Sequence, residues 1–384
     1  RSLHSALYAG MCVVLTAILP AHAAHLTVQV RDALAQPVAG AHVWADDTAP
    51  RTGVTDAAGR CVLSNMPARV VLAVARDGRH GRAVPQRANC VTNVTLTFVL
   101  PHFSAFRCGA YNLMGYDGWT TQQIAALTRI LWTVQPDVLC LQECPDTGLT
   151  FSAFQSQRMP GYTNAVSWVG GPVRNGFLSI YPMVSTISYG ASEMTRDAYT
   201  ARIALPVMGD TTFISVHLKA GGTSNDGVIR NAEAAFVGAL CSNLYRQATY
   251  FMLAGDCNDD PAFVRPPSDV HGILAAAGAG LVQLAPRDDS GSTATYPSFS
   301  RRYDFLYPAQ PWSAFAATTC VVRTDTMTAR PAWLAAGDSA TASDHALIYA
   351  DFLPIPEPCL TGVLLLLVCL QRAFVRTESA RWRC

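Results

Sequence analysis

The sequence predicts a layered α/β domain that follows a small all-β sandwich, and two observations carry this prediction. Within residues 25–100, apolar and polar positions alternate near both ends, and turn-forming residues recur at short intervals between them, which is typical of short strands joined by tight turns. From Arg107 onward, apolar strand-like runs alternate with segments of helical periodicity, which is typical of sheets covered by helices. The chain of 384 residues is long enough for both domains.

The first 23 residues are expected to be a secretory signal peptide. Arg1 and His4 precede an apolar run at residues 6–19, and residues 21–23 (Ala-His-Ala) match a small-x-small cleavage site. The apolar run is shorter than the roughly 20 residues that a membrane-spanning helix needs. We therefore expect cleavage after Ala23 and an exported protein that is cell-surface, membrane-associated or extracellular.

Residues 24–101 are expected to form the β-sandwich. Alternation begins at residues 26–30 and returns at residues 92–100. The segments 36–43 (QPVAGAHV) and 52–60 (TGVTDAAGR) resemble the carboxypeptidase-regulatory-like, or transthyretin-like, sandwich family, whose members are usually accessory or spacer modules. Export would permit disulfides. Cys61 with Cys90 is the pair to test, because both lie in this domain.

Residues 104–354 are expected to form the α/β domain. A short strand at 107–112 precedes a helix that begins near Thr120 or Thr121, carries apolar residues at helical spacing and stops before Pro136. A second helix is expected at 226–244. Further strands are expected at 138–141, 212–218, 249–255, 303–307 and 346–352.

Polar residues stand where these apolar strands end, which ordinary core strands do not do repeatedly. The residues are Asn112, Glu143, His217, Asp256, Asn258, Asp304, Asp344 and His345. Burying such groups is costly unless they are paired or bind a metal. The cysteines show no zinc-type spacing, and oxygen ligands of this kind favour Mg²⁺, or Mn²⁺, over zinc.

The order of these polar groups along the chain resembles the endonuclease/exonuclease/phosphatase family, which includes pancreatic-type deoxyribonuclease, abasic-site endonuclease and sphingomyelinase. The resemblance covers about residues 104–354 and all of the landmarks occur in order. It implies an α/β (α+β) four-layer sandwich, in which two packed mixed β-sheets are flanked by helices and the active site lies at one edge.

The resemblance also implies a metal site. Glu143, helped by Asn112, would hold a divalent ion, and Asp344 would support it. The ion would first act as a Lewis acid on the phosphoryl oxygen.

Five further residues take catalytic roles by the same resemblance. Asp256 and Asn258 would position or deprotonate the attacking water. His217 and His345 would bind the scissile phosphate and share acid–base work, because imidazole titrates near neutral pH. Asp304 would orient His345. The identity of the general base stays open.

The chain departs from the family pattern around the first histidine. Ile180 replaces a basic residue, and Arg174-Asn175 stands where some nucleases carry an acid that pairs with that histidine. The partner of His217 is therefore unidentified. Lys219 follows closely and favours a phosphate site, whereas Arg230 would either contact phosphate or occupy a solvated helix face.

Hydrolysis of a phosphodiester is the expected function, with nucleic acid as the expected substrate. The net charge of +1 provides no overall basic field, so any nucleic-acid groove would have to be local. Trp119 and Trp168 are candidates either for base stacking or for packing. Two alternatives are a phospholipid or sugar-phosphate esterase of the same family and a catalytically silent surface or adhesion protein. The groove candidates are Arg158, Arg174, Arg196, Arg202, Arg301 and Arg302.

Residues 355–384 are expected to form a sorting tail. The tripeptide Pro-Glu-Pro at 356–358 precedes an apolar run at 359–370 and then a basic end. This order resembles the PEP-CTERM sorting signal, which implies sorting machinery and the membrane as partners. With residues 373–375 the apolar stretch reaches about 17 residues, the lower limit for a membrane span. A terminal core helix is the alternative, and the oligomeric state is not indicated.

Overall fold

The computed structural model describes residues 24–169, 171–190, 192, 194–206, 208–247, 249–263 and 266–354. The predicted signal peptide at 1–23 and sorting tail at 355–384 lie outside the described residues. Within the part of the chain that is described, no helix is both long enough and apolar enough to cross a membrane.

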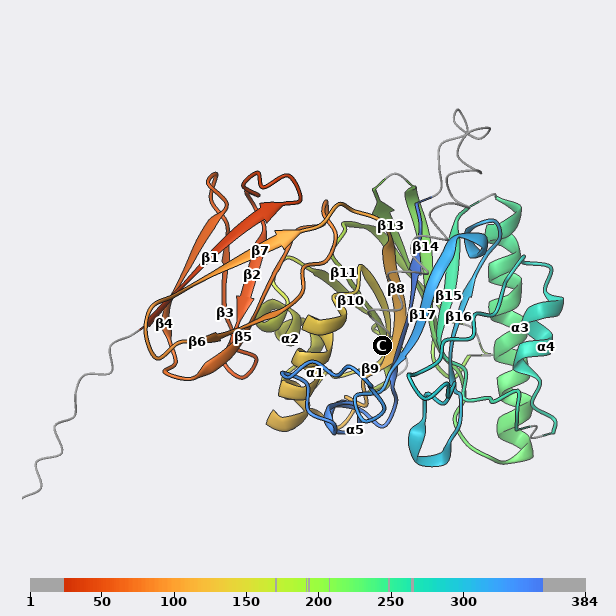
Figure 1. Cartoon of the computed structure of the whole chain (residues 1–384). Coiled ribbons are helices and arrows are strands. Elements are labelled where there is room, and N and C mark those ends of the chain that lie inside the picture. Colours follow the sequence, from red (N-terminus) through yellow and green to blue (C-terminus); the bar gives the residue numbers. More distant parts are fainter. Residues whose placement is uncertain are drawn as a thin grey trace, which may run out of the picture.

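The N-terminal part is a sandwich of two sheets (Figure 1). One sheet has the order β4-β1-β7, with β1 antiparallel to β4 and parallel to β7. Side chains of β1 alternate, and Leu26, Val28 and Val30 are fully buried between the sheets. The strands of this sheet are β1 (Ala24–Asp32), β4 (Arg60–Met66) and β7 (Val94–Leu100). The other sheet, in the order β3-β2-β5-β6, contains β2 (His42–Ala45), β3 (Arg51–Val54), β5 (Val70–Arg76) and β6 (Gln86–Asn89).

The disulfide expected between Cys61 and Cys90 is wrong, because both are buried free thiols. Cys61 lies on β4 of one sheet, and Cys90 directly follows β6 of the other. Facing sheets pack about 10 Å apart, whereas a disulfide requires Cα atoms closer than about 7 Å. The two cysteines therefore contribute to the sandwich core as small apolar side chains.

Two mixed sheets form the centre of the α/β part. The six-stranded sheet has the order β10-β11-β9-β8-β18-β17 and the five-stranded sheet has the order β12-β13-β14-β15-β16. Only β8 with β9 and β14 with β15 are parallel pairs among the described neighbours in these two sheets. The first sheet contains β8 (Phe106–Asn112), β9 (Val138–Cys144), β10 (Thr163–Val166), β11 (Arg174–Ser179), β17 (Ala316–Val322) and β18 (Leu347–Phe352). The second contains β12 (Met183–Tyr189), β13 (Ala198–Leu205), β14 (Gly209–His217), β15 (Phe251–Asp256) and β16 (Asp304–Pro308).

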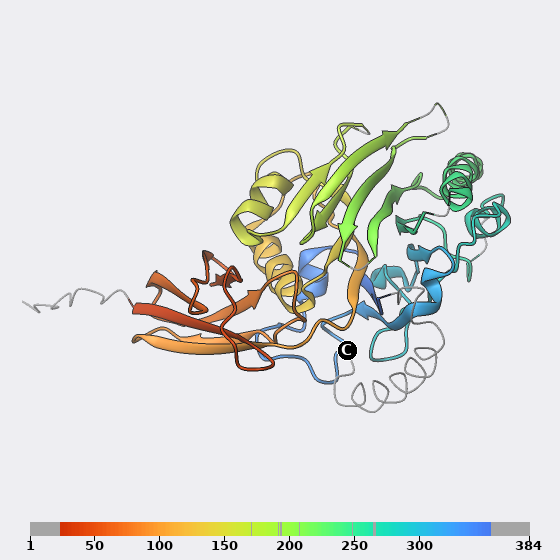
Figure 2. The same cartoon turned by 90° about the horizontal axis from the view of Figure 1, so that it is seen from above.

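Helices cover the outer faces of the two sheets. Figures 1 and 2 show α1 and α2 on the side of the sandwich and α3 with α4 on the opposite side. An apolar core between the sheets joins Phe106 and Ala110 of β8 to Phe213 of β14. The structure therefore confirms the predicted mixed α/β fold, with two sheets inside and helices outside. The helices are α1 (Thr121–Val134), α2 (Phe151–Arg158), α3 (Ser224–Arg246), α4 (Val270–Ala276) and α5 (Asp338–Ala342), with short 3₁₀ turns at Pro297–Phe299 and Trp312–Phe315.

The start and stop of α1 follow local chemistry. The Thr120 side chain accepts from the Gln123 amide and the Gln123 side chain returns a bond to the Thr120 backbone, which together form a capping box. Gln135 ends the helix in a left-handed conformation, and Pro136 cannot continue it. The predicted helix is confirmed.

The sandwich packs directly against the α/β part. Arg76 forms an ion pair with Asp137, and Arg82 places Nη1 2.7 Å from Asp137 Oδ2 and Nη2 3.0 Å from Asp351 Oδ1. Trp44 of β2 lies in the same apolar cluster as α1, and its Nε1 donates to the Pro160 carbonyl at 3.0 Å. The sandwich keeps its own core, but one apolar cluster and the Asp137 ion pairs span the contact between the two parts.

Candidate active site

In both sheets, the strands that end in polar residues reach the same edge of the α/β part. In the six-stranded sheet, β8 ends at Asn112, level with the residue that precedes Glu143 on the parallel strand β9. In the five-stranded sheet, His217 on β14 is level with Asp256 on β15, and Asp304 begins β16 opposite Asp256. The pairing of parallel strands and the face-to-face packing of the two sheets thus bring residues that are distant in sequence to one place.

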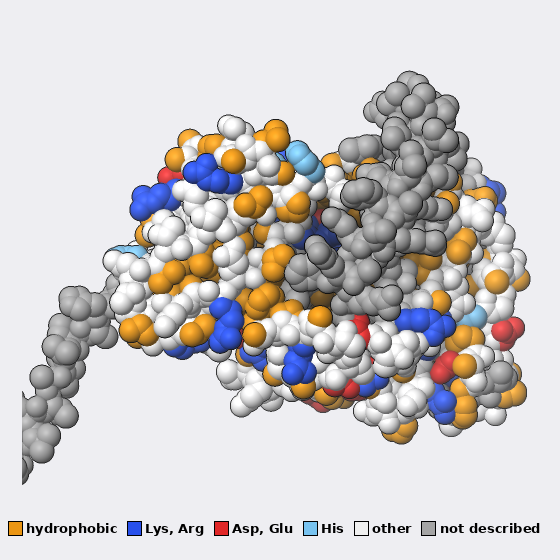
Figure 3. All heavy atoms as spheres, viewed as in Figure 1, with side chains coloured by type: hydrophobic (Ala, Val, Ile, Leu, Met, Phe, Trp, Pro, Cys, Tyr) orange, Lys and Arg blue, Asp and Glu red, His pale blue; other side chains and the backbone are white. Residues whose placement is uncertain are grey.

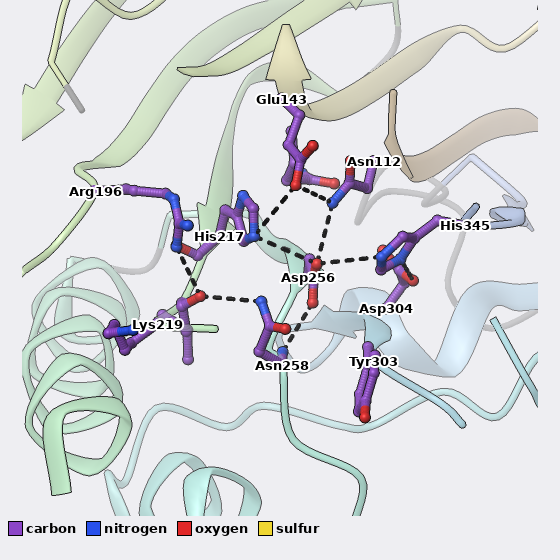
Figure 4. Close-up of polar contacts among 12 residues, drawn as sticks. Asn112, Glu143, Arg196, His217, Lys219, Asp256, Asn258, Tyr303, Asp304 and His345 are labelled. Carbon is purple, nitrogen blue, oxygen red and sulfur yellow. Dashed lines mark hydrogen bonds and ion pairs between the residues drawn. The ribbon is translucent and has the colours of Figure 1, made fainter. Parts of the chain in front are cut away.

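The Asn112 side chain joins the acids of the two sheets. Its Nδ2 donates to Glu143 Oε1 and to Asp256 Oδ2, both at 3.1 Å (Figure 4). Its Oδ1 accepts from the Met114 amide at 3.0 Å, which fixes the direction of the side-chain amide. Glu143 has a φ of 54°, a left-handed conformation that a non-glycine residue rarely adopts. The strand end is therefore shaped to turn this acid into the site.

Asp256 lies between the two predicted catalytic histidines. Its Oδ2 is 3.5 Å from His217 Nε2 and 3.7 Å from His345 Nε2. The other ring nitrogen of His345, Nδ1, lies 2.7 Å from Asp304 Oδ2 (Figure 4). His217 Nδ1 is buried and has no hydrogen-bond partner within the described residues, so its partner is still unidentified.

The two histidines differ in protonation. Burial opposes a charge on His345, but the carboxylates of Asp304 and Asp256 outweigh it and raise the pKa of His345 to about 10. Burial lowers the pKa of His217 well below its usual value, and the nearby Arg196 guanidinium adds to this effect. At neutral pH the site therefore holds one imidazolium and one neutral imidazole.

Burial destabilises the ionised form of two acids of the site, and a bound cation would offset this effect. Burial raises the pKa of Glu143, and the hydrogen bond from Asn112 only partly opposes it. Burial also raises the pKa of Asp256, against the attraction of the His345 charge. A bound divalent ion would stabilise the ionised form of both carboxylates.

Two groups of donors could hold such an ion. Asp256, Asp304 and His345 present ligand atoms within 4.8 Å of one another. His345, however, is charged and already bonded to Asp304, so it repels a cation. The Glu143 side, with Asp256 facing it and Asp344 at the rim of the same cavity, offers carboxylate oxygens without that repulsion. We therefore favour the Glu143 side, where the donors suit an oxygen-binding divalent cation.

Asn258 and Arg196 are held by one carbonyl group. Asn258 Nδ2 and Arg196 Nη1 donate to the Leu218 oxygen at 3.1 and 3.0 Å (Figure 4). The Asn258 amide nitrogen also donates to Asp256 Oδ1 at 2.8 Å. The structure thus brings all eight predicted site residues to one place, either in the cavity wall or bonded to it.

The cavity has a volume of about 340 Å³ and contains residues that the sequence did not single out. Arg196 was one of six arginines with nothing to distinguish it, and only the tertiary structure places it beside His217. The aromatic residues of the wall lie in a long irregular segment that has no strand or helix periodicity. The cavity is lined by Glu143, Arg196, His217, Ala220, Asp256, Asn258, Tyr296, Phe299, Tyr303, Asp344 and His345.

The roles expected for Lys219 and Arg230 need correction. The Lys219 ammonium lies 2.9 Å from Asp226 Oδ1 and donates to the Ala220 carbonyl at 2.6 Å, so its charge is engaged locally. Arg230 is 1% exposed, and its Nη1 donates to the carbonyls of Lys219 and Gly221. Arg230 therefore neither contacts the cavity nor covers a solvated face. It fixes the turn that follows β14.

Comparison with known proteins gives a likeness of fold. No family model matches the chain, and no curated protein does. Solved structures similar to it include the human Nocturnin catalytic domain with bound sulfate (18% identity, 65% of this chain and 94% of that chain, TM-score 0.48). A truncated Caenorhabditis elegans TDP2 (18%, 65% and 98%, 0.48) and an endonuclease/exonuclease/phosphatase from Beutenbergia cavernae (17%, 66% and 72%, 0.49) are also similar. At such low identities and TM-scores the function has to be decided by the chain's own residues.

Proposed function

We propose that this protein is a divalent-metal-dependent hydrolase of phosphodiester bonds, with nucleic acid as its substrate. One observation carries the proposal. Two imidazoles face the same buried aspartate, and one of them is bonded to a second buried aspartate, in a cavity that Glu143 and Arg196 also line. This combination supplies a cation for an anionic substrate, a proton acceptor and ligands for a metal.

Glu143 would hold Mg²⁺, or Mn²⁺, with Asp344 and the acid-positioning amide of Asn112 in support. The bound ion would supply Lewis-acid chemistry at the phosphoryl oxygen. Asn112 fits this role by holding Glu143 and Asp256 in place through its amide nitrogen.

The chain's own groups account for the remaining steps. His345, kept charged by Asp304, would bind a non-bridging phosphate oxygen and stabilise the charge that develops there. Asp256 would accept the proton of the attacking water, since burial moves its pKa toward neutrality and Asn258 holds it. Neutral His217 would contact the phosphate. The His345 imidazolium would hand its Nε2 proton to the leaving oxygen, and the proton that Asp256 takes from the water would restore it across the 3.7 Å between Asp256 Oδ2 and His345 Nε2.

The aromatic wall favours a nucleotide over a lipid or sugar phosphate. Tyr296 and Phe299 stack with centroids 5.4 Å apart and an interplanar angle of 7°, and Phe299 is 66% exposed at the cavity mouth. Flat exposed rings suit nucleobases. On the face in Figure 3, outside the grey atoms, Lys and Arg side chains are dispersed, so recognition would rest on local contacts.

Plasmid nicking by the purified full chain with Mg²⁺ tests this function. We expect nicking that disappears in Asp256→Asn and persists in Asp210→Asn, which alters an exposed acid near the start of β14, toward the end opposite His217. Metal-dependent release of phosphate or a headgroup from lipid, without nicking, would favour the esterase instead. No turnover of any phosphoester would favour a silent surface protein.

We also propose that the hydrolase is exported, with its C-terminal tail engaging sorting machinery and the membrane. The proposal rests on the signal-like and tail-like segments of the sequence. N-terminal sequencing of the mature protein should begin at Ala24, and an unprocessed N-terminus would refute export by this route.

A further inference from the structure

Trp168 is an unusual tryptophan for a folded domain. Its side chain is 87% exposed, more than any other large hydrophobic side chain in the described ranges. Three other tryptophans, Trp44, Trp132 and Trp312, are almost fully buried, and Trp119 packs against Phe154. Packing therefore explains Trp119 but leaves Trp168 without a structural role.

A cation is fixed beside this indole. The Arg174 guanidinium carbon lies 5.5 Å from the centroid of the Trp168 ring. Arg174 is itself held by Asp146, at 2.8 Å, and by the Gly171 carbonyl, at 3.0 Å. The guanidinium is therefore held at a fixed position next to the ring.

The base of the Trp168 loop is anchored by buried polar contacts. Ser167 is 1% exposed and donates its hydroxyl to Asp197 Oδ2 at 2.5 Å. The same hydroxyl accepts from the Val169 amide at 3.0 Å, and the Ser167 amide donates to the Asn175 carbonyl at 2.8 Å. The residues on either side of Trp168 are therefore held in place, which reduces the entropy lost when a ligand stacks on the indole.

Trp168 and Arg174, together called the platform, lie near the candidate active site. Arg174 on β11 pairs in register with Cys144, the residue after Glu143. Glu143 and Asp146 are three residues apart, so their Cα atoms lie within about 10 Å, a length that a few nucleotides of a single strand cover. Asp197, which anchors the loop, directly follows Arg196 of the catalytic cavity.

A second cavity, of about 450 Å³, lies beside the platform. Its wall includes Trp168 and Arg174 together with polar side chains, namely Asp146, Thr150, Ser152 and Asn164. A lipid chain would remove these polar groups from water without offering them new hydrogen bonds. A nucleobase would instead stack its face on the indole and present its polar edge to the polar side chains of the wall.

We infer that Trp168 and Arg174 form a stacking subsite for a nucleobase of a single strand whose phosphodiester occupies the catalytic cavity. The inference rests on the proposed function and names its substrate more closely. Stacking on an aromatic side chain tolerates any base and is reinforced by arginine. The subsite would hold the strand a few nucleotides from the bond that is cleaved.

The test compares Trp168→Leu with Trp168→Phe in the full chain. Binding of a fluorescent single-stranded 12-mer is measured by anisotropy in EDTA, so that no cleavage occurs. Trp168→Leu should weaken binding about tenfold, at the lower end of base–aromatic stacking, whereas Trp168→Phe should keep most of the affinity. Leu34→Ala, an exposed apolar residue of the sandwich, should bind like the wild type.

Turnover of bis(p-nitrophenyl) phosphate, which has no nucleotide strand extending from the bond that is cleaved, should be equal in all of these variants. Wild-type affinity in Trp168→Leu, or equal losses in the Leu and Phe variants, would overturn the stacking subsite. If the wild-type chain hydrolyses neither plasmid DNA nor bis(p-nitrophenyl) phosphate, the proposed hydrolase function is wrong. The binding comparison in EDTA still decides whether Trp168 stacks on a nucleobase.

Discussion

Asp137→Asn tests how the sandwich is joined to the α/β part. Asp137 is fully buried and accepts from Arg76, from Arg82 at 2.7 Å and from the Arg107 amide at 2.7 Å. Burial opposes the charge of Arg76, and Asp137 outweighs that effect and raises the pKa of Arg76. The neutral amide would leave a buried guanidinium, 1% exposed, without its counter-charge.

Removing one partner of a buried ion pair costs about 3–5 kcal/mol. For a unit of roughly 330 residues that unfolds together, with an unfolding entropy of about 2.1 cal/mol/K per residue, this lowers Tm by roughly 4–7 °C. Circular dichroism melting of wild type and Asp137→Asn measures the shift. Arg76→Met combined with Asp137→Leu should recover only part of it, because the Arg76 charge is gone but Arg82 and the Arg107 amide still lose their acceptor.

A Tm change below about 1 °C in Asp137→Asn would refute this reasoning, since it would mean that water or local opening solvates the pair. Two separate melting transitions would mean that the apolar cluster and ion pairs at the contact do not make the sandwich and the α/β part unfold together.

Three further predictions concern single side chains. Asp304→Asn should lower kcat on a chromogenic diester by about 10²–10³, because His345 loses the carboxylate that orients and charges it; an unchanged kcat would contradict this. Lys219→Ala should keep the KM for the same diester within about twofold, because the ammonium pairs with Asp226; a large rise in KM would place that charge on the substrate. Asp351 is buried, but two arginines overcome the effect of burial and lower its pKa. Its ionised form therefore stabilises the fold above the unfolded pKa of about 3.9, and this stabilisation is lost as the pH falls through the lower folded pKa. Urea unfolding of Asp351→Asn should therefore show a deficit of about 3 kcal/mol at pH 7 that shrinks below pH 4, and a pH-independent deficit would count against the ion pair.

The sequence was most informative where chemistry follows secondary structure. Apolar strands that end in Asn112, Glu143 and Asp256 predicted a shared site, because neighbouring strand ends meet at one sheet edge. The left-handed φ of Glu143 could not be foreseen, since it depends on the turn that follows β9. Periodicity also predicted α1 and α3, whose caps are encoded locally.

Long-range contacts were the part that the sequence could not provide. Arg196 and Arg230 both lie within about 25 residues of His217 in the sequence. Arg196 lines the cavity, whereas Arg230 is buried beneath a turn. Trp119 and Trp168 were equally plausible stacking residues until burial separated them. The contact between the sandwich and α1 likewise depends on how two independently patterned segments pack.

Glu143, Asp256 and His345 would act together with a divalent cation on a phosphodiester. The most direct measurement is the initial rate of bis(p-nitrophenyl) phosphate hydrolysis by the full chain as Mg²⁺ is increased, for the wild type and for Glu143→Gln. We predict a rate that rises with Mg²⁺ to a plateau in the wild type and stays at background in the variant. Equal rates in EDTA and in Mg²⁺, or wild-type rates in Glu143→Gln, would contradict the account.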